Sequence, residues 1–200
     1  MRLTIPNILT LLRIGLIPVL VLFFYLPFSW SHLATTVVFA LAGATDWLDG
    51  YLARRLGDTS AFGAFLDPVA DKLMVATSLV LLVDRNPTEY SGVLLTIPAA
   101  IIIGREITIS ALREWMAELG AATTVAVSYI GKVKTTAQMV ALVLLLYRDP
   151  VAGIDAAEVG FYLLYLAALL TLWSMSVYLN AAWPVLVSGE KSRSNVEKDA

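Results

Sequence analysis

Four aspartates in the first half of the chain are spaced so that each pair shares one face of an α-helix. Asp46 and Asp49 are three residues apart on one expected helix. Asp67 and Asp71 are four residues apart on the next expected helix. The two helices are joined by a short loop, so we expect them to form an antiparallel pair in which the four carboxylates converge. Two like charges about 4 Å apart repel by about 4 kcal/mol at an effective dielectric of 20, so such a cluster must take up protons or bind cations.

The types of ligand available in this chain indicate which cation it would be. The sequence has no cysteine and one histidine, so carboxylate oxygens would have to supply the ligands. Oxygen ligands of this kind favour the hard divalent ions Mg²⁺ and Mn²⁺. Two such ions would balance four carboxylates in charge. Two metal ions that bridge a pyrophosphate suit in-line displacement at phosphorus, and an aspartate at the edge of the site could accept the proton of an attacking hydroxyl.

Small residues accompany the aspartates on both expected helices. Gly50 and Ala53 lie on the face of Asp46 and Asp49, within an arc of about 140°, and Gly63 lies on the face of the second aspartate pair. Their small side chains leave a slot through which a nucleotide or a pyrophosphate could approach the backbone. Arg54, on the same face as Gly50, would offer the phosphates a fork of hydrogen-bond donors.

The composition indicates which elements must position these residues. The chain has 200 residues, of which 58% are hydrophobic and 15% are charged. Its mean hydropathy is +0.77. Soluble domains are about 45–50% apolar and about 25% charged, so the excess indicates lipid as the solvent. The formal net charge of −2 argues against a nucleic-acid partner, and the absence of cysteine excludes disulfides and cysteine nucleophiles. We expect an all-α, polytopic membrane protein.

Six hydrophobic segments are each long enough to cross about 30 Å of hydrocarbon as a helix. They span residues 6–28, 32–55, 61–83, 92–118, 122–147 and 157–187. The polar stretches 84–91 and 148–156 contain prolines and are predicted to form turns. We expect one membrane domain over residues 1–187 and a mobile, polar C-terminal tail over residues 188–200, with no cleavable signal peptide and no internal repeat.

The distribution of charge predicts the orientation of these six transmembrane helices. With both termini in the cytoplasm, only Arg85 and Arg148 of the 14 basic residues face outward, as the positive-inside rule requires. Charges inside the segments also lie toward the cytoplasmic ends, so we expect a polar cavity open to the cytoplasmic side. A carboxylate within the membrane costs about 2.5–3.5 kcal/mol, so four of them indicate a functional site.

The full spacing D-x2-D-G-x2-A-R-x8-G-x3-D-x3-D, from Asp46 to Asp71, resembles the signature of the CDP-alcohol phosphatidyltransferase family, and every position is present. Further stretches extend the resemblance to a bacterial branch of this family. They are residues 5–13, 62–72, 105–115 and 131–138. The likeness as a whole reaches from the N-terminus into the sixth segment.

The resemblance implies a homodimer of six-helix subunits in the bacterial cytoplasmic membrane, with both termini inside. Its implied reaction transfers a phosphatidyl group from CDP-diacylglycerol to sn-glycerol 3-phosphate and releases CMP, a step in phosphatidylglycerol biosynthesis. The implied ligands of two Mg²⁺ or Mn²⁺ ions are Asp46, Asp49, Asp67 and Asp71, with Asp71 also the candidate base. The residues expected at the CDP moiety are Gly50, Ala53, Arg54 and Gly63.

An acceptor that carries a phosphate needs further cations, because two metal ions only balance the aspartates. Arg105 and Arg113 are about 80° apart in helical phase and can share a face. Lys132 and Lys134 are about 200° apart, so only one of them faces inward on a straight helix. We predict that both arginines and at least one lysine bind the acceptor phosphate. Two other readings stay open: Arg105 and Glu106 form a structural ion pair, or the lysines reach lipid phosphates.

Three alternative functions are weighed against this one. A cation or proton transporter predicts charges in both halves of the membrane and inverted repeats, and neither is visible here. A structural partner subunit explains none of the aspartate spacing. A sister transferase with another acceptor, such as inositol phosphate or phosphatidylglycerol, shares the catalytic signature and is separated from the leading reading only by the stretches around residues 105–115 and 131–138.

Overall fold

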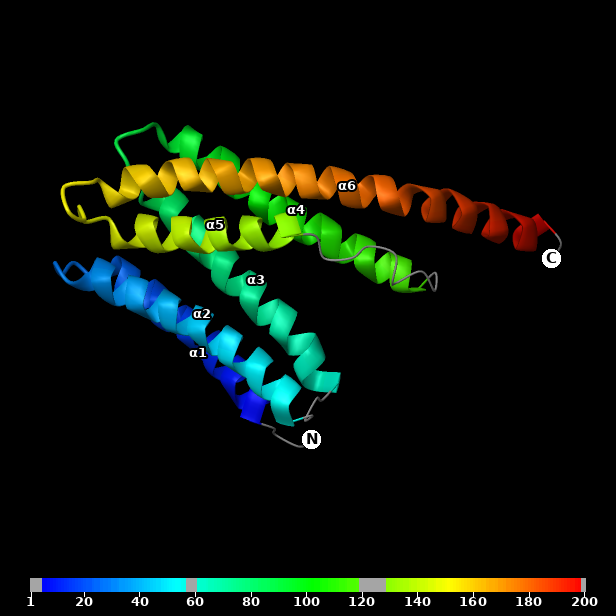
Figure 1. Cartoon of the computed structure of the whole chain (residues 1–200), viewed down its shortest axis with the longest axis horizontal. Helices are drawn as coiled ribbons and strands as arrows, with labels where there is room; N and C mark the ends of the chain where they lie inside the picture. The colour runs from blue at the N-terminus through cyan, green and yellow to red at the C-terminus, as the bar shows by residue number, and fades with distance from the viewer. Residues whose placement is uncertain (1–4, 57–60, 119–128, 199–200) are drawn as a thin grey trace. The chain divides into compact units, whose positions relative to one another are not determined.

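Helices make up most of the computed structural model, which describes residues 5–56, 61–118 and 129–198 (Figure 1). These residues contain six helices: α1 (Ile5–Tyr25), α2 (Ser31–Leu56), α3 (Ala61–Asp84), α4 (Gly92–Glu118), α5 (Tyr129–Tyr147) and α6 (Ala156–Lys198). The all-α prediction is confirmed, and each hydrophobic segment coincides with one helix. Residues 122–128 of the fifth segment and the loop that joins the two aspartate helices lie outside the described residues.

Local sequence accounts for several features of these helices. Asp155 caps the start of α6, because its Oδ1 accepts hydrogen bonds from the backbone nitrogens of Ala157 at 2.8 Å and Glu158 at 3.2 Å. Prolines lie inside α1, α3 and α4, at Pro18, Pro68 and Pro98. Prolines are tolerated in membrane helices because neighbouring groups satisfy the freed backbone carbonyls.

The last helix is longer than the hydrophobic pattern predicts. We expected the sixth helix to end at residue 187, and α6 continues to Lys198. The added residues include Glu190, Lys191 and Arg193, straight-chain residues that favour helix. Hydropathy marks the apolar part of a helix, and polar helix formers can extend it beyond that part.

Three of the described helices are long and apolar enough to cross a membrane. The candidate spans are Asn7–Tyr25, Gly92–Glu118 and Ala156–Trp183. Each also exposes large apolar side chains, such as Leu12 on α1, Val93 on α4 and Trp173 on α6. Apolar surface of this kind is expected where lipid, and not water, surrounds a protein. The other three spans remain predictions.

The chain divides into two compact units, each built from parts of several helices. The first unit comprises residues 1–96 and 139–162, and the second comprises residues 97–138 and 163–200. The boundary therefore runs through α4, α5 and α6.

In the first unit, α1 has much more extensive contacts with α2 and with α3 than these two have with each other. In Figure 1, α1 and α2 run side by side. Buried side chains from all three helices form the core here, including Leu20, Phe39 and Leu82. We expected the two aspartate helices to meet directly. Helices α2 and α3 do contact each other, but each of them packs more extensively against α1.

Helices α5 and α6 approach each other closely at Gly160 in the first unit. A Cβ atom at this glycine would lie 2.9 Å from Cγ of Leu145 and 3.0 Å from the carbonyl oxygen of Ala141. Real Cβ atoms rarely come so close to backbone atoms. The absence of a side chain at Gly160 therefore sets how near the two helices can come.

Polar contacts join the loops of the first unit to its helices. His32 Nε2 lies 2.6 Å from Oδ2 of Asp149. The hydroxyl of Tyr90 donates to Oε1 of Glu158 at 3.0 Å and lies 2.9 Å from the hydroxyl of Tyr162. These hydrogen bonds, first that with Tyr162 and then that with Glu158, raise the pKa of Tyr90. The contact with Asp149 ties His32, near the start of α2, to the loop that follows α5.

Candidate functional site

The predicted metal ligands lie on α2 and α3 in the first unit. Asp46 lies on α2 with about half of its side chain accessible, 49%. On α3, Asp67 is half-buried and Asp71 is exposed. The side chain of Asp49 lies outside the described residues. Solvent therefore reaches the carboxylates of Asp46 and Asp71.

Two polar residues of α1 hold two of these aspartates. Arg13 Nη1 donates to Oδ1 of Asp46 at 2.8 Å, and the Arg13 side chain is 1% exposed. One turn earlier, Thr10 Oγ1 donates to Oδ1 of Asp67 at 2.5 Å. Both residues lie in the stretch that resembles the family, but the sequence prediction assigned neither of them to the site. The sequence does carry a signal for them, because an arginine and a threonine three residues before it interrupt the apolar stretch 8–28.

The donor set on α2 and α3 fits a hard divalent cation in its chemistry, since it consists of carboxylate oxygens. Among the described residues, no three His, Cys, Asp or Glu side chains lie close enough together to hold a metal ion. The side chain of Asp49 is not among these residues. The four-aspartate metal site therefore remains a prediction, and the contacts of Asp46 and Asp67 with α1 are what the structure adds to it.

The residues predicted to face the CDP moiety are only partly described. Gly50, Ala53 and Arg54 fall within α2, but their surroundings lie outside the described residues. Gly63 lies on α3 and is buried. The predicted slot along the aspartate faces is thus neither confirmed nor contradicted.

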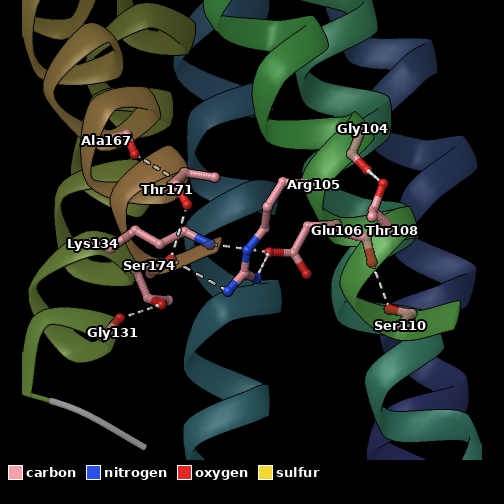
Figure 2. A network of polar contacts seen from close by, with 11 residues as sticks. Gly104, Arg105, Glu106, Thr108, Ser110, Gly131, Lys134, Ala167, Thr171 and Ser174 are labelled. Atoms are coloured by element: carbon pink, nitrogen blue, oxygen red, sulfur yellow. Dashed lines mark hydrogen bonds and ion pairs between the residues drawn. The ribbon is translucent and has the colours of Figure 1, made fainter. Parts of the chain in front are cut away.

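The second unit contains a network of polar contacts between charged side chains of α4 and α5 and hydroxyl side chains of α6, which Figure 2 shows from close by. Arg105 Nη1 donates to Oε1 of Glu106 at 2.7 Å. Lys134 Nζ donates to the same oxygen at 3.1 Å. Arg105 Nη2 lies 3.5 Å from Oγ of Ser174, whose own hydroxyl donates to the carbonyl oxygen of Thr171 at 2.9 Å. Two cations from different helices therefore share one carboxylate oxygen.

The charge balance of this network leaves it positive. Arg105 and Lys134 carry two positive charges, and Glu106 offsets one of them. The side chains of Arg105 and Lys134 are 16% and 6% exposed, so water screens their charges poorly. The Nε atom of Arg105 is buried and has no hydrogen-bond partner among the described residues. A net positive charge with a spare guanidinium donor suits an anion such as a phosphate.

Arg113 and Lys132 are also predicted to bind the acceptor phosphate. Within the described part of the chain, neither belongs to this hydrogen-bonded network. The guanidinium carbon of Arg113 lies 5.6 Å from the ring centre of Tyr178 on α6, a cation–π contact. Lys132 is exposed, whereas Lys134 is buried. Helix geometry predicted that only one of the two lysines faces inward, and Lys134 is that residue.

Glu106 is the residue of this network that the sequence prediction treated only as a possible structural partner of Arg105. Glu106 also binds Lys134. The ion pair of Arg105 with Glu106 therefore belongs to a cluster that holds two of the residues predicted to bind the acceptor phosphate. Lys134 lies on a different helix from Glu106, so residue spacing along the sequence could not predict this contact. The carboxylates on α2 and α3 belong to the first unit, and the cations around Glu106 belong to the second.

Comparisons with known proteins identify the family of this chain. The sequence pattern of the CDP-alcohol phosphatidyltransferase family matches residues 3–173. A CDP-diacylglycerol–glycerol-3-phosphate 3-phosphatidyltransferase of Yersinia enterocolitica is 58% identical over 187 residues, which cover 94% of this chain and 99% of the relative. Proteins of the same name from Sodalis glossinidius and Pectobacterium atrosepticum are 58% and 57% identical over 184 residues, 91% of this chain and 96% of each relative. Because the family pattern covers most of the six-helix chain, including all four aspartates, the protein belongs to the CDP-alcohol phosphatidyltransferase family.

Proposed function

We propose that this protein transfers the phosphatidyl group of CDP-diacylglycerol to sn-glycerol 3-phosphate and releases CMP. The observation that carries the choice of acceptor is the pair of cations, Arg105 and Lys134, held on one oxygen of Glu106. A phosphomonoester acceptor needs such a pair. The relatives that match nearly the whole chain are named for this acceptor.

The donor side of the reaction is assigned to the aspartates. We propose that Asp46, Asp49, Asp67 and Asp71 hold Mg²⁺ or Mn²⁺, which when bound would stabilise negative charge on the pyrophosphate of the donor. Gly50, Ala53, Arg54 and Gly63 would accommodate the CDP moiety. Asp71 would accept the proton of the acceptor hydroxyl as its oxygen bonds to the phosphorus that carries the diacylglycerol, while the bond from that phosphorus to CMP breaks.

Arg105 and Lys134 would bind and orient the acceptor by its phosphate. Each contact of this type joins a cation to an anionic oxygen and is stronger than a neutral hydrogen bond. Arg113 and Lys132 would add positive potential near the phosphate, from more exposed positions. The net positive charge around Glu106 thereby favours a charged acceptor over a neutral alcohol.

We propose a single displacement with no phosphatidyl-enzyme intermediate. The chain has no cysteine, and its one histidine is engaged with Asp149. Incubation with labelled CMP and CDP-diacylglycerol in the absence of acceptor is expected to give no exchange of label. Rapid exchange would establish a covalent intermediate instead.

The setting we propose is the bacterial cytoplasmic membrane, with both termini inside, the polar cavity open to the cytoplasm and two copies of the chain forming a homodimer. Because the chain has no cysteine of its own, single cysteines introduced at Ser29 and at Ser192 report the orientation. An impermeant maleimide added to whole cells is expected to label the first and not the second. Cross-linking in native membranes tests the dimer, and a band at monomer size alone would contradict it.

The experiment that tests the proposed function uses the purified protein in detergent micelles with CDP-diacylglycerol and a panel of acceptors, and it follows CMP release. Glycerol 3-phosphate is expected to support release at a much higher rate than inositol phosphate, phosphatidylglycerol or free glycerol. Comparable or higher rates with another acceptor would assign the chain to a sister activity of the same family. No release with any acceptor would contradict the transferase proposal.

A further inference from the structure

Thr10 is a buried polar residue on α1 whose hydroxyl is directed at a predicted metal ligand on another helix. Its side chain is 0% exposed. Its Oγ1 atom donates to Oδ1 of Asp67 on α3 at 2.5 Å. Most threonine hydroxyls in membrane helices bond to a carbonyl of their own helix, as Thr35 does to the carbonyl oxygen of Ser31 at 2.7 Å. The hydroxyl of Thr10 also reaches another helix, because it bonds to a carboxylate far along the chain.

Helix α1 is held in place between the two aspartate helices. Three residues after Thr10, Arg13 forms its ion pair with Asp46 of α2. The contacts of α1 with α2 and with α3 are also more extensive than those between α2 and α3. The position of Asp67 relative to Asp46 is therefore set through α1, and Thr10 makes the contact on the α3 side.

This contact constrains how the Asp67 carboxylate is turned. The last torsion of an aspartate is broad, so an isolated carboxylate on a helix rotates freely. A donor fixed on Oδ1 removes that freedom, and Oδ2 stays outside the contact. Hydrogen bonds from residues behind a metal ligand orient it, and their loss weakens metal binding by about 10–100-fold.

We propose that Thr10 is a positioning residue for the metal site: its hydroxyl holds Oδ1 of Asp67 so that the carboxylate is already oriented when a divalent cation binds. This inference rests on the proposed role of Asp67 as a metal ligand. Thr10 itself does not contact the metal or the substrates. Its effect on catalysis passes through the affinity of the site for its cation.

The test measures Mn²⁺ binding directly. The full chain is purified in detergent micelles, and free Mn²⁺ is followed by electron paramagnetic resonance during a titration without substrates. Thr10→Val removes the hydroxyl at nearly constant volume, and Thr10→Ser restores a donor. Thr35→Val is the matched control, because Thr35 is also 0% exposed and lies in the first unit. We expect the Kd for Mn²⁺ to rise about 10–100-fold in Thr10→Val and to stay within about threefold of the unmodified protein in Thr10→Ser and Thr35→Val.

Thermal unfolding of the metal-free proteins separates a positioning role from a purely structural one. A structural role would lower the Tm of Thr10→Val and of Thr35→Val alike while leaving the Mn²⁺ affinity of the folded protein unchanged. If Thr10→Val is not obtained folded, Thr10→Ala provides the same comparison with Thr10→Ser.

The outcomes distinguish this inference from the proposal on which it rests. Mn²⁺ binding by the unmodified protein with an unchanged Kd in folded Thr10→Val, or in folded Thr10→Ala, overturns the role of Thr10 alone. Loss of affinity in Thr10→Ser equal to that in the variant without a hydroxyl overturns it too. No saturable Mn²⁺ binding by the unmodified protein overturns the proposed metal site and this inference with it.

Discussion

Lys134 on α5 and Glu106 on α4 form an ion pair in which the ammonium lies 3.1 Å from one carboxylate oxygen, and the lysine side chain is 6% exposed. A buried ammonium is costly unless an opposite charge and hydrogen bonds compensate it. Glu106 supplies that compensation and, through the same oxygen, also holds Arg105. The pair therefore fixes two cations relative to each other within the second unit.

Replacing Glu106 by glutamine is expected to lower the thermal stability of the protein. The amide keeps the shape of the side chain but removes the charge that offsets Lys134 and Arg105, and breaking a buried ion pair by removing one partner costs about 3–5 kcal/mol. The midpoint of thermal unfolding in detergent micelles measures this effect. Glu114→Gln is the control, because Glu114 lies on the same helix and is exposed. Equal midpoints for the two variants would mean that the Glu106 contacts add no stability.

Replacing Lys134 by glutamine is expected to raise the KM for glycerol 3-phosphate by one to two orders of magnitude, with a much smaller change in the KM for CDP-diacylglycerol. Loss of one charge-assisted contact, about 1.5–3 kcal/mol, corresponds to that change. Arg105→Gln should behave in the same way. Lys132→Gln should have a smaller effect, because Lys132 is exposed and Lys134 is buried. If the KM for the donor rises instead, these cations serve CDP-diacylglycerol and the acceptor assignment is wrong.

Removal of divalent cations is expected to abolish CMP release, and added Mg²⁺ or Mn²⁺ should restore it. Converging carboxylates repel one another strongly unless cations bind between them. Asp46→Asn and Asp67→Asn should each nearly abolish turnover while the protein still inserts and folds. Asp84→Asn is the control on the same helix as Asp67, because Asp84 lies at the end of α3 and bonds to Tyr25. Full turnover in excess EDTA would falsify the metal proposal.

Substitution of Gly160 by alanine is expected to destabilise the first unit. The added Cβ would meet the side chain of Leu145 and the carbonyl oxygen of Ala141 at 3.0 Å or less, so α5 and α6 must move apart. Overpacking of this kind costs about 1–3 kcal/mol. Thermal unfolding in micelles measures the cost. Gly15→Ala is the control, because a Cβ there has no neighbouring atom within 4 Å. A midpoint for Gly160→Ala equal to that of the control would mean that α5 and α6 can move apart without loss of stability.

The sequence by itself determined the features that depend on neighbours along the chain. Stretches of apolar residues predicted six helices, and their boundaries agree closely with α1 to α4. Helical periodicity placed Lys132 and Lys134 on opposite faces, and the structure leaves one exposed and the other buried. These features follow from the fixed rise and turn of an α-helix, which relate residues only a few positions apart.

The tertiary structure decided which helix faces meet. Thr10 reaches Asp67, and Lys134 reaches the carboxylate that also binds Arg105, through contacts between residues far apart in the sequence. The aspartate spacing predicted a direct pairing of α2 and α3, whereas α1 makes more of the contacts with both. The rotation of a helix about its axis and the choice of its neighbours depend on how side chains from several helices pack together. No spacing within a single helix contains that information, because the contacts arise only once the helices are assembled.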